Sequence, residues 1–343
     1  MSNPLSTPIS RRQTLATLGA GTAGLAIAGP AAALQSPPKT DAQKLLDSVA
    51  DNLLALSPEG ATALGIDTGA RAAMRGKLGD RSAAGQKTVA DTLKADLARV
   101  RAFDKAGLDH STRTSLAVVE SAYGVALDGF ALPYGDVAVG GWRNTPYVVI
   151  QNVGAYLDVP KFLDSDHPVK TSADAEAYLS RLGAFPGVLD GETDRLKAAG
   201  GQGLIAPTFL IDKAVKQMEA SLADAKAGGA MVESLVRRTG AAKIAGDWSA
   251  RSAKIVQGPV AAALERPLTA MKAQRPKATM DAGMWARPGG DEWYAWGLRA
   301  STTTRMTPTR FTRWAAKNSP NSMDGWTRSS RSWATPKARS ATG

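Results

Sequence analysis

The sequence contains no cysteine and only two histidines, His110 and His167. The absence of cysteine excludes disulfides and Cys-ligated zinc. The two histidines are far apart, and neither belongs to an H-x-x-x-H pair, in which imidazoles one helical turn apart share a metal ion. His110 follows Asp109 at a predicted helix start, and His167 precedes Pro168 in a predicted loop. We therefore expect both histidines to be surface or capping residues rather than metal ligands.

Acidic residues are scarce at both ends of the chain, which has a net charge of +11 over 343 residues. Residues 309–343 carry a net +6, and the first 33 residues add Arg11 and Arg12. The long middle therefore holds only +3 and contains no stripe of cations that could follow a phosphate backbone. We expect a soluble globular protein without a nucleic-acid partner.

The chain also lacks a long apolar run. The stretch from Ala16 to Ala28 is rich in Gly and Ala and is too short for a good membrane span, so we expect no permanent membrane anchor. Ser10–Leu15, which includes Arg11 and Arg12, resembles the twin-arginine export motif, and Ala31–Ala33 offers an A-x-A cleavage site. This pattern predicts a signal peptide over residues 1–33, a partner in the export machinery and a periplasmic or secreted protein; an uncleaved anchor is the alternative.

Beyond a linker at residues 34–41, apolar residues recur at helical spacing as far as residue 308, with no internal repeat. The sequence predicts a mostly α, multi-helix, bundle-like domain over 42–308, with one long Gly- and aromatic-rich loop and few short strands. Tyr147–Ile150 is the best strand candidate. Thr171-x-x-Asp174 predicts a capping box at the start of one helix, and another helix is predicted from Ala242 to Lys272 with a break near Gly258 and Pro259. The repeating positions are Leu46, Val49, Leu53 and Leu56; Val89, Leu93, Leu97 and Val100; Leu116, Val119, Tyr123, Leu127 and Phe130; and Tyr178, Leu182, Phe185 and Leu189.

Two stretches break the helical pattern. Residues 132–156 form the long loop, and residues 281–308 concentrate Trp285, Trp293, Tyr294 and Trp296. Long irregular segments often carry function. Packing of the loop on the bundle, and of the aromatic cluster in the core, is the simpler interpretation.

Four segments together resemble the bacterial domain-of-unknown-function 885 family: Ser57–Asp67, Asp80–Gln86, Thr145–Pro168 and Gly290–Pro308. The resemblance runs from about residue 42 to Pro308. It implies relatives of about twice this length, similar to zinc metallopeptidases, with a HExxxPGHH-like segment in their C-terminal half. The resemblance therefore implies zinc for full-length relatives. This chain contains no such segment, so no cofactor, metal ligand or catalytic residue is expected in it.

The resemblance therefore predicts the N-terminal portion of an exported metallopeptidase-like hydrolase that is inactive alone. If this portion contributes to a substrate cleft, Tyr and Thr hydroxyls can hydrogen-bond a peptide backbone and an arginine can hold a carboxylate. The candidates for binding a peptide or small-molecule ligand are Tyr134, Tyr147, Arg299, Thr302 and Thr303. The alternative is a complete periplasmic helical ligand-binding or scaffold protein.

The last 35 residues, 309–343, are rich in Arg, Ser, Thr and Trp and show no period. Family members continue after a TTT-x-x-TP segment into an Asp/Glu-Ile/Val-His helix start. Restoring one base before the Thr309 codon permits Asp-Glu-Val-His-Ala-Met-Gly in the shifted frame. We therefore interpret residues 309–343 as an out-of-frame, disordered tail; a genuine basic tail that binds an acidic partner is the alternative.

Resequencing genomic DNA across the codons for Met306 to Trp314 tests this interpretation. We expect either one base missing from the reported sequence or the family's remaining half encoded just downstream in another frame. An unchanged sequence with nothing related downstream would contradict the truncation.

Overall fold

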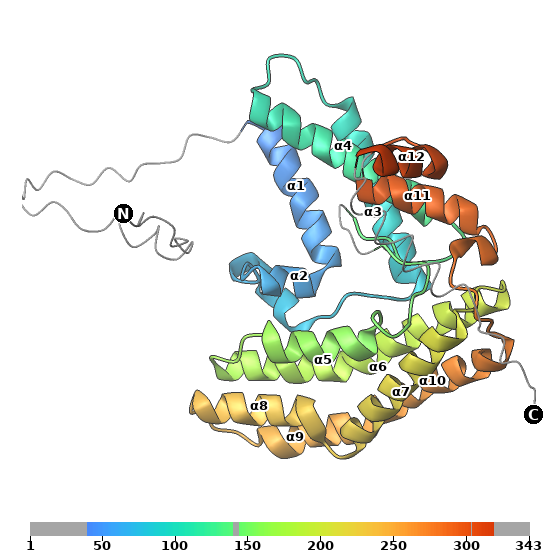
Figure 1. The fold of residues 1–343 in the computed structure, drawn as a ribbon. Helices are drawn as coiled ribbons and strands as arrows, with labels where there is room; N and C mark the ends of the chain where they lie inside the picture. Colours follow the sequence, from blue (N-terminus) through green and yellow to red (C-terminus); the bar gives the residue numbers. More distant parts are fainter. Residues whose placement is uncertain (1–39, 140–143, 303, 319–343) are drawn as a thin grey trace, which may run out of the picture. The chain divides into compact units, whose positions relative to one another are not determined.

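The computed structural model of the chain describes residues 40–139, 144–302 and 304–318, all in one unit that begins at Thr40. The predicted signal peptide with Arg11 and Arg12, residues 34–39 of the linker, Thr303 and residues 319–343 lie outside the described residues. The longer helices (Figure 1) are α1 (Asp41–Leu56), α3 (Ala83–Ala102), α4 (His110–Phe130), α5 (Ala155–Ser165), α6 (Ser172–Gly201), α7 (Thr208–Lys226), α8 (Gly229–Ala241), α9 (Trp248–Ile255), α10 (Ala261–Gln274), α11 (Gly290–Thr302) and α12 (Pro308–Asn318).

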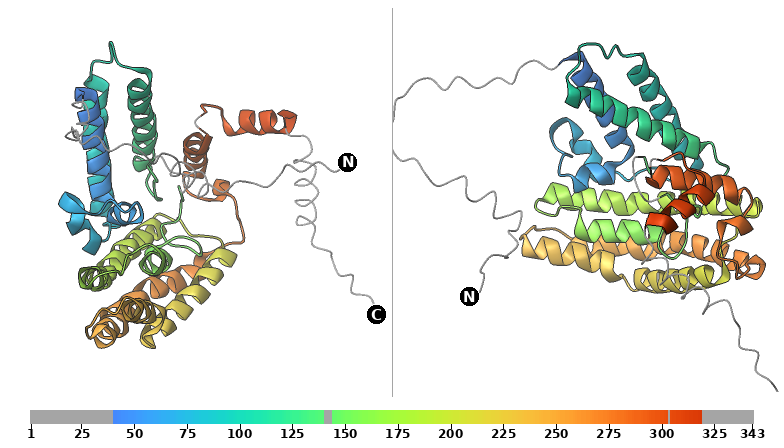
Figure 2. Two further views of the ribbon diagram at one scale, coloured as in Figure 1. Left: turned by 90° about the vertical axis from the view of Figure 1, so that its left-hand side faces the viewer. Right: turned by 45° about the horizontal axis from the view of Figure 1, so that its top comes forward.

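The predicted mostly α, multi-helix fold is confirmed. Helices α1, α3 and α4 share one apolar core around Leu93, Leu97 and Leu116, as the helical spacing predicts. Helices α5 to α10 enclose a second and larger core, which the two views of Figure 2 show as a separate stack. The long helix α6 starts at a capping box formed by Thr171 and Asp174, as predicted.

A short helix, α2 (Pro58–Ala63), and a 3₁₀ segment, η1 (Gly69–Gly76), connect α1 to α3. Although α1 and α3 both belong to the smaller core, η1 packs against α6 of the larger one. Two further 3₁₀ turns, η3 (Arg275–Lys277) and η4 (Met284–Ala286), follow α10. This region places the aromatic cluster in two environments: Trp293 and Trp296 of α11 are buried, whereas Trp285 and Tyr294 are exposed.

The predicted strand at Tyr147–Ile150 is not formed. The described residues contain only two isolated β-bridges, Asp136 with Thr145 and Ile150 with Val153. The apolar side chains of Val148, Val149 and Ile150 enter the larger core instead, so burial and not strand pairing explains this run.

The helix predicted from Ala242 to Lys272 begins later, at Trp248, because Lys243 and Gly246 adopt positive φ angles of 55° and 152° in the preceding turn. The predicted break near Pro259 is confirmed as a π-helical turn, η2 (Val256–Val260). Proline lacks the N–H that a regular α-helix would use there, which favours such a bulge.

The start of the predicted tail also differs from expectation. Residues 309–318 belong to helix α12 and are not irregular. Pro308 occupies the first helical position, where its missing N–H costs nothing, and the Thr307 hydroxyl accepts from the N–H of Arg310 at 3.3 Å. No described helix has an apolar stretch long enough to cross a bilayer.

A fully buried arginine, Arg181 of α6, connects α6 to α2 and η1. Its Nε donates to the Lys77 carbonyl at 2.8 Å, and its Nη2 donates to Thr62 Oγ1 at 2.8 Å and the Met74 carbonyl at 3.1 Å. Burial lowers the pKa of Arg181 to about 10, which leaves it charged at neutral pH. A buried cation is tolerated only when its N–H groups are satisfied, and here main-chain carbonyls provide most of the acceptors.

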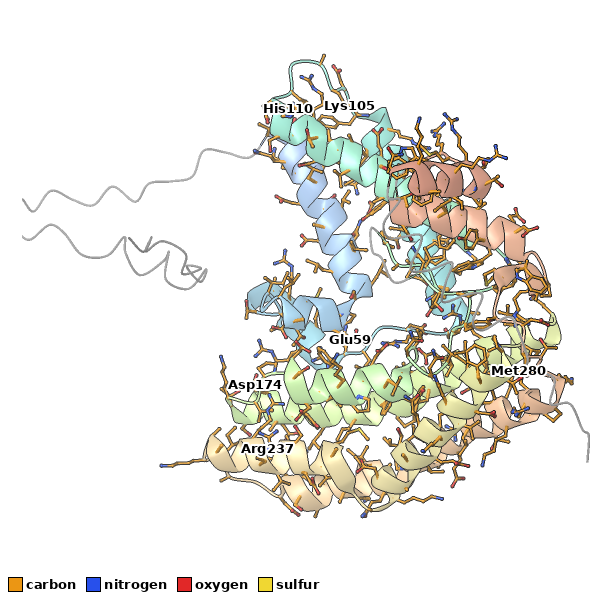
Figure 3. All side chains as sticks on the ribbon, viewed as in Figure 1. Glu59, Lys105, His110, Asp174, Arg237 and Met280 are labelled. Carbon is orange, nitrogen blue, oxygen red and sulfur yellow. The ribbon has the colours of Figure 1, made fainter. Side chains whose placement is uncertain are left out.

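Asp174 lies at the start of α6, seven residues before Arg181 (Figure 3). Its Oδ1 accepts from Arg75 of η1 at 2.6 Å, and Arg75 also pairs with the buried Asp67 at 2.8 Å. The α2–η1 segment is therefore held to the N-terminal half of α6 by two arginines, one from each side of the contact.

His167 belongs to the same network, and its expected surface or capping position is wrong because the ring is fully buried. Its Nδ1 accepts from Arg181 Nη1 at 2.7 Å, so its Nε2 carries the proton and donates to the Asp174 carbonyl at 2.9 Å. Burial, with Arg181 and Arg238 close by, lowers the pKa of His167 to about 4. His110, in contrast, is the exposed first residue of α4 after the cap Asp109, as predicted.

These contacts predict acid sensitivity. The pKa of His167 is about 4 when folded and near its ordinary value of 6.5 when unfolded, so its contribution to stability is fully present above pH ~6.5 and is lost as the pH falls toward 4. The loss should be on the order of 3 kcal/mol. Urea unfolding at several pH values should show this decline in the wild type and in the control His110→Gln, and a shallower decline in His167→Gln. Equal declines in all three would contradict the assignment.

Candidate functional site

Three segments that are distant in sequence meet beside the middle of α6. They are the segment before α3 with Arg81, the loop after α4 with Asp136, and the start of α5 with Asp158. They enclose a pocket of about 270 Å³. Its lining residues are Arg81, Gln86, Asp136, Val137, Ala138, Thr145, Val153, Asp158 and Arg195.

Glu192 of α6 lies behind this pocket with a residue exposure of 3%. Its Oε1 accepts from Arg81 Nη1 at 2.9 Å, and its Oε2 accepts from the N–H of Ala155 at 2.6 Å. Ala155 is the first residue of α5, and the preceding Gly154 has no side chain with which to cap the helix. Glu192 therefore supplies the negative charge that a helix N-terminus favours.

Arg195, one turn further along α6, fixes the loop on the other side of the pocket. Its Nη2 donates to the Gly135 carbonyl at 2.8 Å and to Asp136 Oδ1 at 2.5 Å, and its Nη1 donates to the Arg81 carbonyl at 3.2 Å. Gly135 is required here because its φ of +103° favours glycine and an added Cβ would lie 2.8 Å from the Thr145 carbonyl.

Charged side chains of both signs meet at the pocket, where they are buried or partly buried. Burial raises the pKa of Glu192, an effect that Arg81 opposes. Burial also acts to lower the pKa of Arg81, but Glu192, Asp158 and Glu59 together outweigh it, and the pKa of Arg81 is raised above its ordinary value. Nη1 of Arg81 makes contacts with Glu192 and, at 3.3 Å, with Asp158. Its Nε and Nη2 donate no hydrogen bond within the described residues, so this pocket can offer N–H donors to a polar ligand.

The predicted ligand-binding residues fall into two separate places. Tyr134 donates to the Pro288 carbonyl at 2.6 Å, and Tyr147 accepts from Arg287 Nε at 3.0 Å. Burial raises the pKa of both tyrosines. The two hydroxyls thus hold the long loop against the turn that precedes α11.

Arg299 and Thr302 lie on α11. Arg299 pairs with Asp128 of α4 at 2.7 Å, and Thr302 Oγ1 donates to the Leu298 carbonyl of its own helix at 2.6 Å. Arg299 borders a groove of about 1020 Å³ between α3, α4 and α11. Thr303 lies outside the described residues. The structure therefore brings Tyr134 and Tyr147 together and leaves Arg299 and Thr302 elsewhere; their part in ligand binding stays a prediction.

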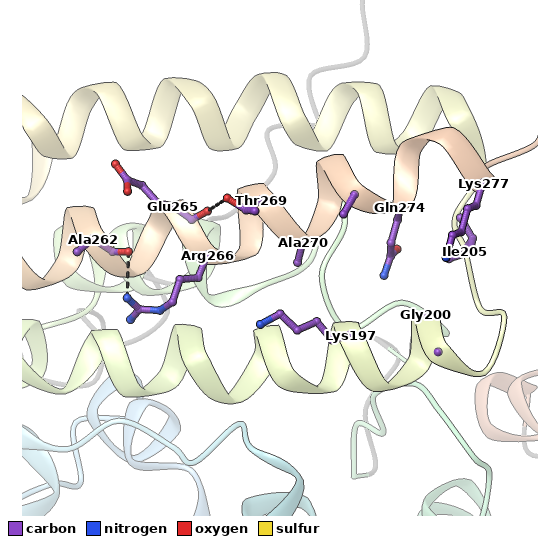
Figure 4. Close-up of a pocket in the computed structure, with 12 residues that line it drawn as sticks. Lys197, Gly200, Ile205, Ala262, Glu265, Arg266, Thr269, Ala270, Gln274 and Lys277 are labelled. Carbon is purple, nitrogen blue, oxygen red and sulfur yellow. Dashed lines mark hydrogen bonds between the residues drawn. The ribbon is translucent and has the colours of Figure 1, made fainter.

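Another groove, of about 760 Å³, runs between α6 and α10 (Figure 4). Its lining includes small residues such as Gly200 and Gly201 of α6 and Ala270 of α10. Two of its four charged lining residues are paired, since Arg266 contacts Asp190 and Glu265 contacts Lys226. None of the four segments that carry the family resemblance supplies a lining residue to this groove, unlike the pocket at Arg81.

The described residues do not fit the zinc that the resemblance implies for full-length relatives. Within them, no group of three or more His, Asp or Glu side chains is arranged to hold a metal ion. Both ring nitrogens of His167 are engaged in hydrogen bonds, and His110 lies at an exposed helix start.

Sequence reasoning missed the residues that build the pocket: Arg81, Asp136, Glu192 and Arg195. One signal was available. Glu192 falls three residues after Leu189 and four before Leu196, on the buried stripe of α6. A charged residue on an apolar helix face is costly unless it is paired, and so it marks a specific contact.

The model of the bacterial protein family of unknown function DUF885 matches residues 58–320. The chain belongs to the DUF885 family. The match includes Arg81, the long loop, Glu192 and Arg195, and it continues past Pro308, where we expected the resemblance to end, so that all of α12 is included. A search of curated proteins found no match to the chain.

Two solved structures share the fold of this DUF885 chain. One is described as "the putative lipoprotein from Colwellia psychrerythraea", with 17% identity, a TM-score of 0.70, and coverage of 79% of this chain and 48% of that one. The other is described as "a putative lipoprotein of unknown function from Shewanella oneidensis", with 13% identity, a TM-score of 0.57, and coverage of 88% and 50%. The chain thus spans about half the length of the structures it matches.

The close contact between α4 and α11 gives a test of the packing near Arg299. Trp296 Nε1 donates to the Val125 carbonyl at 2.8 Å, and an added Cβ at Gly129 would lie 2.1 Å from Trp296. Gly129→Ala should displace Trp296 and cost about 1–3 kcal/mol, measured by urea unfolding and near-UV circular dichroism. The control is Gly183→Ala, where the added Cβ meets nothing within 4 Å and stability should hold or rise slightly. Equal effects of the two changes would contradict the packing.

Proposed function

We propose that this chain is the ligand-binding, non-catalytic portion of an exported metallopeptidase-like hydrolase. The observation that carries the proposal is the pocket at Arg81, where segments resembling the family converge on buried charges and on Arg81 N–H groups that donate no hydrogen bond within the part of the chain that the structure describes. Its volume of about 270 Å³ lies just below the range of roughly 300–1,000 Å³ that is usual for small-molecule sites. The ligand is therefore small, on the scale of a short peptide or an amino-acid derivative.

Export is part of the same proposal. It rests on the twin-arginine-like segment Ser10–Leu15 and on the description of both solved relatives as lipoproteins. The 343 residues contain no cysteine. The hydrolytic chemistry of full-length relatives would come from their zinc-bearing half, and no step of it is assigned to residues of this chain.

The proposal predicts that ligand binding is lost when the pocket is filled. Ala138→Trp places a large ring in the pocket, whereas Ala220→Trp adds the same ring at an exposed site on α7. Isothermal titration with trialanine should detect binding to the wild type and to Ala220→Trp, and at least tenfold weaker binding to Ala138→Trp. Equal affinities in the two variants would place peptide binding outside the pocket.

The second part of the proposal predicts that the purified chain does not hydrolyse peptides. With one equivalent of Zn²⁺ added, a fluorogenic peptide should be cleaved no faster than in buffer with Zn²⁺ alone. Tight, stoichiometric zinc binding with peptide cleavage that co-purifies with the chain would refute the non-catalytic assignment.

A further inference from the structure

Helix α12 and the residues just before it carry only positive charge. Residues 304–318 contain four cations, Arg305, Arg310, Arg313 and Lys317, and no acidic residue. All four are exposed. Within the described part of the chain none of them forms an ion pair, although many surface arginines elsewhere do, such as Arg266. This cluster is therefore a free positive surface rather than half of a network.

The same helix carries two neighbouring aromatic rings. Phe311 and Trp314 are three residues apart, which places them on one helix face, and their ring centroids are 5.9 Å apart. Phe311 is half-buried, whereas Trp314 is 51% exposed. No residue of α12 is fully buried. The helix thus presents an indole ring flanked by cations to its surroundings.

We infer that α12 docks on an anionic phospholipid surface. Arg310, Arg313 and Lys317 would contact lipid phosphates, and Trp314 would lie at the level of the headgroups, where amphipathic indoles are favoured. The positive charge that would meet the anionic lipid is concentrated at α12, because the whole segment 34–308 carries a net charge of only +3. A nucleic acid would be better matched by an extended row of cations than by one short helix with an exposed indole. This inference rests on residues 304–318 as they stand in this sequence, and it does not depend on the proposed function.

The test uses the whole chain and sedimented vesicles of phosphatidylglycerol and phosphatidylcholine in equal parts, with phosphatidylcholine alone as the neutral comparison. Each cation near an anionic surface strengthens binding by about fivefold at moderate salt. We expect binding to the mixed vesicles that weakens with added salt, and at least tenfold less binding to phosphatidylcholine alone.

Variants then assign the binding to α12. Arg310→Glu combined with Arg313→Glu and Lys317→Glu should weaken vesicle binding by at least tenfold, and Trp314→Ala should weaken it by a smaller factor. The matched control reverses three exposed lysines on other helices, Lys213→Glu, Lys216→Glu and Lys254→Glu, and should bind like the wild type. Far-UV circular dichroism verifies that each variant folds.

Three results would overturn the inference. They are equal binding to neutral and anionic vesicles, equal weakening by the α12 and control variants, and displacement of the vesicles by a DNA duplex that binds α12 more tightly. The last would assign the helix to a nucleic acid instead.

Discussion

A single buried guanidinium is the constraint that sets how α2 and η1 pack on α6, beside the candidate site. Arg181 is inaccessible to solvent, yet it remains charged at neutral pH. Moving such a charge out of water is costly, so each of its N–H groups needs an acceptor in place. The acceptors come from α2, η1 and His167, and these segments must therefore pack on α6 in one register.

Buried charged residues hold other segments against helix α6 along its length. Asp174, Arg181 and Glu192 all lie on its buried stripe, among residues such as Tyr178 and Leu189. The first two secure η1 and α2, and Glu192 caps α5 and pairs with Arg81. The pocket therefore forms where α6 binds the segment before α3, the loop after α4 and the start of α5. Its charges are positioned by contacts that also stabilise the fold.

The sequence predicted those parts of the fold that local periodicity determines. Some features depend only on neighbours within a few residues of sequence. They are the apolar faces of α1, α3, α4 and α6, the capping box at Thr171 and the break at Pro259. The pocket could not be predicted in the same way, since Arg195 meets Gly135 and Asp136 across some 60 residues of sequence. His167 was misassigned for a similar reason, because the arginine that it accepts from lies on another element.

The most direct test of the account is amide hydrogen exchange on Arg181→Met. This change keeps the length of the side chain but leaves the Lys77 and Met74 carbonyls and the Thr62 hydroxyl without their donor. The account predicts a selective loss of protection over residues 58–76, with α7 and α10 still protected. Unchanged protection over 58–76, or an equal loss in every helix, would contradict the claim that Arg181 holds α2 and η1 on α6.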